Sequence, residues 1–142
     1  MKNNDLSNQT APILAFNADT LLFEESKGVG FMQKIVDKFK TESQLYLERE
    51  INKTTRYILE KIWNNQNVAI HLVTFESFSG EIEDYLREED IYFTHMHEVK
   101  NFEEFVIKVR NNYMYYFDSD TSILSRLGCK HALNFLEINK VI

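Results

Sequence analysis

The 142-residue sequence predicts an α/β fold, with a mostly parallel sheet of about five strands and helices on both faces. Two observations predict it. Short apolar runs, typical of strands buried on both faces, alternate with longer segments whose apolar residues recur at helical spacing. Polar residues directly follow several of these runs, where an open parallel sheet has its ligand crevice. The expected architecture is therefore a Rossmann-like three-layer sandwich.

The strand predictions rest on short apolar or aromatic runs that lack a helical stripe. The first is entered through Pro12 and ended by Asn17, and two others follow turn-like asparagine pairs. In chain order, the expected strands are residues 13–16, 68–74, 91–96, 113–117 and 131–135.

Three helices are expected between these strands. The longest spans residues 42–64, because apolar residues recur there at helical spacing among charged ones. A second spans 79–87 with Ser79 as its N-terminal cap, and a third spans 102–110. The stripe of the long helix consists of Leu47, Ile51, Ile58 and Ile62.

Composition narrows the class of protein. The length fits one domain, placed at residues 12–142 after a flexible leader at 1–11. The formal net charge of −6 disfavours a nucleic-acid partner, and no run of about 18 apolar residues predicts a membrane span. Cys129 is the single cysteine, which suits a reducing compartment. We therefore expect a cytoplasmic protein.

Polar side chains follow three of the expected strands. Asn17 and Asp19 follow the first, Thr74 ends the second, and Asp118 and Asp120 follow a later one. Because carboxyl ends of parallel strands meet at one edge of a sheet, these side chains are expected to share a crevice. Carboxylate oxygens suit hard cations. Asp19, Asp118 and Asp120 are therefore candidate ligands for Mg²⁺ beside a phosphate.

The ordered motifs resemble those of the haloacid dehalogenase (HAD) superfamily. Residues 13–21 look like its first motif, an apolar strand ending in Asp-x-Asp-x-Thr. Thr74 matches the second motif, while Asp118 and Asp120 match the acidic fourth motif that binds Mg²⁺. The resemblance also implies a lysine that neutralises a phosphoryl group. Lys100, in an expected loop, is preferred over Lys108 for this part.

The first motif departs from the family pattern at two positions. Asn17 stands where the family keeps its nucleophilic aspartate, and an amide is a poor nucleophile. Leu21 replaces the usual hydroxyl residue and leaves Thr20 one position early. Asp19 matches the general acid/base position, but without a nucleophile it can only orient water or retain a cation.

These departures predict a HAD-like protein that has lost ordinary phosphatase chemistry and binds a phosphorylated small ligand or a protein partner. One alternative is an active Mg²⁺-dependent phosphohydrolase acting on a nucleotide or sugar phosphate. Another is an oligomeric regulatory module that buries the stripe of helix 42–64 against a second copy. The resemblance also implies that residues 22–31, containing Gly28 and Gly30, form a turn and flap that follow the first motif and screen the crevice.

Several candidate residues also have structural interpretations. Asp19 and Thr20 can cap a turn, and Asp118 to Asp120 can cap a helix beginning near Ser122. His71 lies within an expected buried strand and is read as a core histidine. His95 and His97 share one face of an extended segment and could bind a metal together, but the sequence identifies no third ligand.

Overall fold

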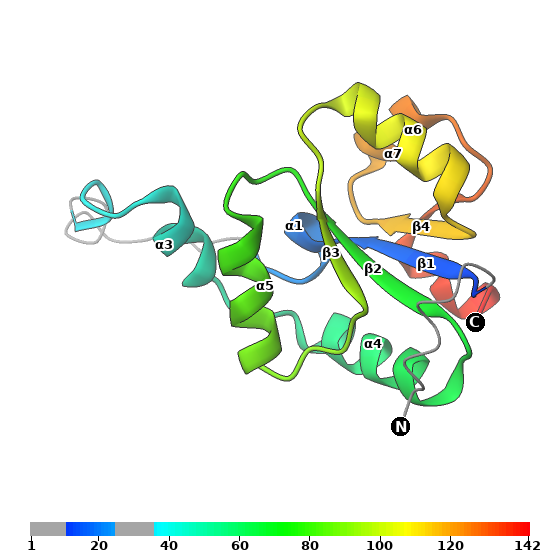
Figure 1. The fold of residues 1–142 in the computed structure, drawn as a ribbon, viewed down its shortest axis with the longest axis horizontal. Coiled ribbons are helices and arrows are strands. Elements are labelled where there is room, and N and C mark those ends of the chain that lie inside the picture. The colour runs from blue at the N-terminus through cyan, green and yellow to red at the C-terminus, as the bar shows by residue number, and fades with distance from the viewer. Residues whose placement is uncertain (1–10, 25–35) are drawn as a thin grey trace.

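The computed structural model describes residues 11–24 and 36–142, and within them it confirms the predicted α/β architecture. A five-stranded, all-parallel sheet runs in the order β3-β2-β1-β4-β5 (Figure 1). The strands are β1 (Ile13–Asn17), β2 (Ala69–Thr74), β3 (His95–Glu98), β4 (Tyr115–Asp118) and β5 (Ala132–Asn134).

Helices cover both faces of the sheet and complete a Rossmann-like three-layer sandwich. Figure 1 shows α6 and α7 on one side of the strands and α4 on the other. The helices are α1 (Ala18–Leu21), α3 (Glu42–Leu47), α4 (Lys53–Asn65), α5 (Ser79–Glu88), α6 (Phe102–Asn112), α7 (Thr121–Leu127) and the 3₁₀ helix η2 (Phe135–Lys140).

The two sheet faces separate the core into two apolar clusters because successive strand residues point to opposite sides. Phe16 and Phe117, on neighbouring strands, stack with ring centroids 5.2 Å apart and are fully buried beside α4 and α5. On the opposite face, Ala15 and Val73 pack with Phe105 of α6. Apolar burial on both faces is the main stabilising term for such a sheet.

The strand order places a topological switch between β1 and β4. The chain builds β1, β2 and β3 outward in one direction, then crosses back through α6 to place β4 on the other side of β1. The carboxyl ends of β1 and β4 are therefore the place where such sheets usually bind ligands. Asn17 and Asp118 occupy these two ends.

The prediction of a single helix over residues 42–64 is wrong. The chain forms α3 and α4 instead, separated by an extended segment in which Ile51 makes an antiparallel bridge with Phe23. The Asn52 backbone N–H also donates to the Leu22 carbonyl at 2.7 Å, and the Asn52 side chain caps α4. Pairing with residues that follow α1 thus breaks the helical pattern.

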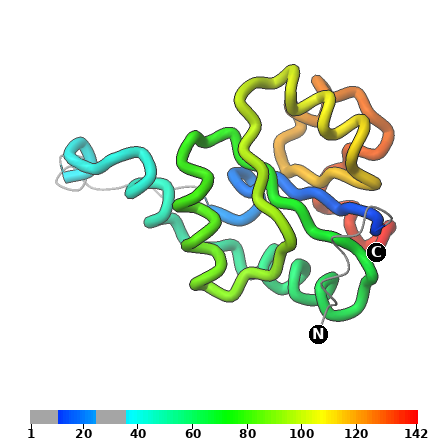
Figure 2. The backbone as a smooth tube through the Cα atoms, in the orientation of Figure 1, coloured from blue at the N-terminus to red at the C-terminus, as the bar shows by residue number. Residues whose placement is uncertain are grey.

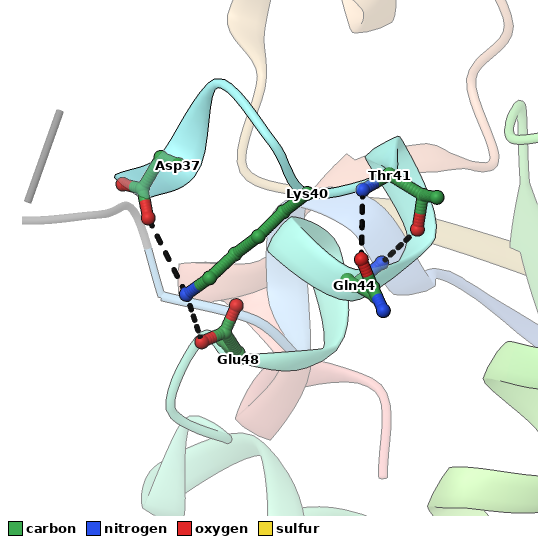
Figure 3. Close-up of polar contacts among 5 residues, drawn as sticks. All are labelled: Asp37, Lys40, Thr41, Gln44 and Glu48. Carbon is green, nitrogen blue, oxygen red and sulfur yellow. Dashed lines mark hydrogen bonds and ion pairs between the residues drawn. The ribbon is translucent and has the colours of Figure 1, made fainter. Parts of the chain in front are cut away.

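The segment around α3 is fixed by local polar contacts (Figure 3). The Lys40 ammonium lies 2.6 Å from the Glu48 carboxylate and 3.4 Å from that of Asp37. Thr41 and Gln44 form a capping box at the start of α3, each side chain accepting a backbone N–H of the other. Figure 2 shows this segment at the periphery of the molecule, beside α5. The segment places Tyr46 beside Asp19, near the carboxyl ends of the strands.

Other boundaries differ in smaller ways. The expected strand at 91–96 is shifted, since Ile91 and Phe93 are buried in a loop and β3 begins only at His95. Ser79 does not cap α5; its hydroxyl donates to Glu98 at 2.8 Å instead. Residues 1–10 of the expected leader and most of the expected flap, including Gly28 and Gly30, lie outside the described residues. Among the described helices, none is long and apolar enough to cross a membrane.

Candidate functional site

Three polar residues end neighbouring central strands and are almost completely shielded from solvent. Asn17, Thr74 and Asp118 are 1%, 0% and 0% exposed, at the ends of β1, β2 and β4. Such burial is tolerated only when each polar atom has a hydrogen-bond partner. The predicted gathering of these side chains at one sheet edge is therefore accompanied by an extensive polar network.

The Asp118 carboxylate accepts four hydrogen bonds from the protein. Its Oδ2 accepts from the Asn17 amide at 2.9 Å and from the Tyr116 hydroxyl at 2.6 Å. Its Oδ1 accepts from the Thr20 hydroxyl at 2.6 Å and from the Asp120 backbone N–H at 2.9 Å. Hydrogen bonds of this kind offset the cost of burying a carboxylate. Both oxygens of Asp118 are thus occupied by protein donors.

Tyr116 is a permanent donor in this network. Burial raises the pKa of its hydroxyl well above the ordinary value, and the adjacent Asp118 carboxylate raises it further. The hydroxyl therefore stays protonated over the physiological pH range. Because Tyr116 precedes Asp118 by two residues on β4, both side chains lie on the same sheet face.

Asn17 performs two structural tasks at once. Its Oδ1 accepts the backbone N–H groups of Asp19 at 2.9 Å and Thr20 at 3.2 Å, which caps α1. Its Nδ2 donates to Asp118 across the switch between β1 and β4. An ionised aspartate could accept the same backbone bonds but could not donate to Asp118. The amide therefore suits the buried neighbour that it contacts.

Asp19 is the more accessible carboxylate of the site and is held by three donors. Its Oδ1 accepts from the Thr74 hydroxyl at 2.7 Å and from the Tyr46 hydroxyl of α3. Its Oδ2 accepts the Phe75 backbone N–H at 3.0 Å. These contacts join α1, the end of β2 and α3. The expected meeting of Asp19 with Thr74 is found, although Asn17 rather than Asp19 caps the first turn.

The surroundings of Asp19 are acidic. Burial raises the pKa of the Glu76 carboxyl, and the negative charges of Asp19 and Glu42 raise it further. Arg49 acts in the opposite direction and lies with its guanidinium 4.6 Å from the centroid of the Tyr46 ring. Burial also raises the pKa of Tyr46, so its hydroxyl remains a donor to Asp19.

Among the described residues, the remaining site candidates add no side-chain hydrogen bond to this network, although the backbone N–H of Asp120 donates to Asp118. Asp120 caps α7, since its Oδ1 accepts the Ser122 N–H at 2.9 Å and the Ile123 N–H at 3.3 Å. The Ser122 hydroxyl, which donates to the same oxygen at 2.7 Å, is the largest cause that lowers the pKa of Asp120, and the backbone bonds lower it further. Lys100 is exposed, just beyond the end of β3. Lys108 lies within α6, where its charge acts on His71 and His97.

The arrangement fits Mg²⁺ poorly. A magnesium ion requires closely spaced oxygen ligands in near-octahedral geometry. Both oxygens of Asp118 already accept two protein hydrogen bonds each, and both oxygens of Asp19 are also engaged. Within residues 11–24 and 36–142, no group of three or more His, Cys, Asp or Glu side chains stands ready to hold a metal ion. A metal would have to displace protein donors.

A second polar group occupies the face of β2 and β3 opposite Met96. The His97 Nε2 and the His71 Nδ1 lie 3.0 Å apart, so the expected core histidine is paired with another histidine. Burial lowers the pKa of His71 to about 3 and that of His97 to about 4, and neighbouring positive charges add to both effects. Both rings are therefore neutral near pH 7. His95 lies beside them and is exposed.

Sequence reasoning missed three hydroxyl donors of the site. The alternation of β4 could have indicated Tyr116, because it shares a face with Asp118. The hydroxyl of Thr20, in the single turn of α1, donates to Asp118, while Leu21 is buried in the core. Tyr46 carried no local signal, since it lies 27 residues from Asp19 and arrives through the break between α3 and α4.

Comparison of the chain with protein-family models, curated proteins and solved structures finds no match. The site must therefore be interpreted from its own geometry.

Proposed function

We propose that this chain is a HAD-like domain that has lost ordinary phosphatase chemistry and acts by binding. The carrying observation is the hydrogen bond from the Asn17 amide to the buried Asp118 carboxylate. Asn17 is a neutral donor at the position where the family resemblance implies a nucleophilic aspartate. Its hydrogen bond also engages an oxygen of Asp118, a residue that the resemblance assigns to Mg²⁺ binding. The polar residues of the motifs then serve to fix the ends of β1, β2 and β4.

The charges favour a protein partner over a free phosphorylated ligand. The negative charges of Asp19 and Glu42 both act on the carboxyl of Glu76, so a phosphate without a metal would be repelled there. A basic segment of a protein would be attracted, in agreement with the net charge of −6. Arg49 and the exposed Lys100 are the positive groups that a phosphorylated ligand would use instead.

Nuclear magnetic resonance can separate the two kinds of ligand. Addition of a short lysine-rich peptide should shift the backbone amide signals of Phe75 and Glu76, and salt should reverse the effect. Inorganic phosphate should leave these signals unchanged. Shifts caused by phosphate alone, and lost in Lys100→Gln, would instead identify a phosphorylated ligand and overturn the proposed preference.

An active phosphohydrolase is the second candidate, favoured by the contact of Asp19 with the Thr74 hydroxyl at 2.7 Å. Asp19 would have to orient water, and Mg²⁺ would have to enter beside Asp118 and Asp120. Turnover of a panel of nucleotide and sugar phosphates tests this directly. Our proposal expects no Mg²⁺-dependent turnover above that of Asp19→Ala. Turnover that this substitution abolishes would establish the enzyme instead.

The oligomeric module receives less support. Leu47, Ile51 and Ile58 pack against the chain's own core, and Ile62 is 1% exposed, so the predicted stripe is largely used within the domain. A second copy would have to bind other surface, such as the exposed Tyr57. Light scattering at high concentration should therefore give the mass of a monomer.

A further inference from the structure

Three of the four histidines converge on one face at the edge of the sheet. His71 of β2 pairs in register with His95 of the edge strand β3, and His97 follows two residues later on β3 (Figure 1). Residues two apart on a strand point to the same side, so all three imidazoles stand together on the face opposite Met96. The sequence alone had indicated only His95 and His97 as possible metal ligands.

The ring positions resemble those of a three-histidine metal centre. The ring centroid of His71 lies 4.7 Å from that of His97 and 5.2 Å from that of His95, and the last two are 6.0 Å apart. Imidazoles bound to one tetrahedral ion have centroids about 5 Å apart, given metal–nitrogen bonds of about 2 Å. The 3.0 Å between His97 Nε2 and His71 Nδ1 is also near the roughly 3.3 Å that tetrahedral ligation requires.

One adjustment is needed to complete the site. As the described side chains lie, no group of three such ligands is arranged to hold a metal ion. His71 and His97 are half-buried and mutually oriented, whereas His95 is exposed. Rotation of an exposed ring about its side-chain torsions needs no change in the core. His95 can therefore turn its nitrogen toward the other two.

We propose that His71, His95 and His97 bind one divalent transition-metal ion of the Zn²⁺ class, with a fourth position open to solvent. Neutral imidazole is a preferred ligand for such ions, and three histidines leave room for a water molecule. The site is separate from the network around Asp118, so it does not depend on the function proposed above.

Two charges near the cluster modulate its affinity for a cation. Lys108 of α6 acts on both His71 and His97 and opposes a bound cation. Glu83 of α5 acts on His97 with the opposite sign. Removal of the lysine charge should therefore strengthen metal binding, a response that a merely structural histidine cluster would not give.

Calorimetric titration of the full chain with Zn²⁺ in a non-chelating buffer tests the proposal. Wild type should bind one ion, and His95→Gln should weaken binding by about tenfold or more. Because His95 is exposed, this variant is expected to fold normally. His71→Gln and His97→Gln should have equal or larger effects, and Lys108→Gln should tighten binding roughly threefold.

The fourth histidine supplies a matched control. His131 is hydrogen-bonded to the Val109 carbonyl at 2.8 Å, outside the cluster, so His131→Gln should bind Zn²⁺ as wild type does. Co²⁺ should produce the intense visible absorption of a tetrahedral complex in wild type but not in His95→Gln. Failure of wild type to bind Zn²⁺, or undiminished binding in His95→Gln, would overturn the proposal.

Discussion

The two polar clusters of this domain differ in how completely their groups are paired. At the carboxyl ends of β1 and β4, the Asp118 carboxylate accepts four hydrogen bonds from surrounding residues. On the face of β2 and β3, the three imidazoles share one hydrogen bond with each other within the part of the chain that the structure describes, between His97 and His71. Nearby, the buried Tyr113 hydroxyl has no partner among the described residues, and its ring lies 6.0 Å from that of His71.

This difference separates a structural role from a binding role. A buried charge with all its lone pairs engaged fixes the surrounding strands but has little capacity left for a ligand. Clustered imidazoles with few protein partners contribute less to the fold and keep nitrogens available. The motif-bearing network is thus the better structural element, and the histidine cluster, which no motif marked, is the better candidate ligand site.

Asp118→Ala should have the largest effect on stability. It would remove the acceptor of Asn17, Tyr116 and Thr20 and leave buried donors unpaired, at a cost of about 3–5 kcal/mol in the free energy of unfolding. Asp120→Ala is the matched control, because it removes only the cap of α7 and should cost about 1 kcal/mol. Urea denaturation measures both, and equal costs would contradict the comparison.

Asn17→Asp should destabilise the protein by about 2–4 kcal/mol in metal-free buffer at pH 7. The substitution puts a second carboxylate where the amide nitrogen now lies, 2.9 Å from Asp118. Combining it with Asp118→Asn should restore part of the loss, because one partner is again neutral. A single variant as stable as wild type would show that the amide is not required.

Tyr46→Phe should cost about 1–2 kcal/mol, since Asp19 keeps the donors Thr74 and Phe75. The loss should be accompanied by faster hydrogen exchange in α3, which Tyr46 connects to the strand ends. Tyr57→Phe, at a 65% exposed side chain, is the control and should be neutral. Unchanged hydrogen exchange in α3 would show that the Tyr46 hydroxyl does not hold this helix in place.

Acidification should lower the contribution of the histidine cluster to stability. The pKa values of His71 and His97 are lowered in the folded protein, to about 3 and about 4, from an ordinary value near 6.5. The unfolded chain therefore binds protons first, so this contribution is complete above pH 6.5 and is lost as the pH falls toward 4 and 3. The loss should be about 1 kcal/mol after allowance for solvent screening.

Urea denaturation in metal-free buffer at pH 7 and pH 5 checks this dependence. His71→Gln should show a smaller difference between the two pH values than wild type does. His131→Gln should retain the wild-type difference, because His131 lies outside the cluster. An unaltered pH dependence in His71→Gln would show that the cluster does not titrate as described.

The sequence predicted the layers of the fold better than the details of the site. Buried strands such as β1 and β2 carry their signal locally, in continuous apolar runs. The break between α3 and α4 depends on pairing of Ile51 with Phe23, which helical periodicity cannot reveal.

The same distinction applies to the site residues. Strand ends brought Asn17, Thr74 and Asp118 together as predicted, because parallel topology requires it. Other donors to the carboxylates of the site, including Tyr46, come from positions that the topology of the sheet does not determine. The third histidine of the cluster was hidden for a related reason, since the register of β2 against β3 places His71 opposite His95.

Calorimetric titration with Mg²⁺ tests the central claim most directly, that protein donors have replaced the metal at the strand ends. Wild type should not bind Mg²⁺. Asn17→Asp should bind Mg²⁺ and regain stability, because the ion would lie between two adjacent carboxylates and offset their repulsion. Mg²⁺ binding by wild type that Asp118→Ala abolishes would contradict the account and favour the alternative function, an active phosphohydrolase.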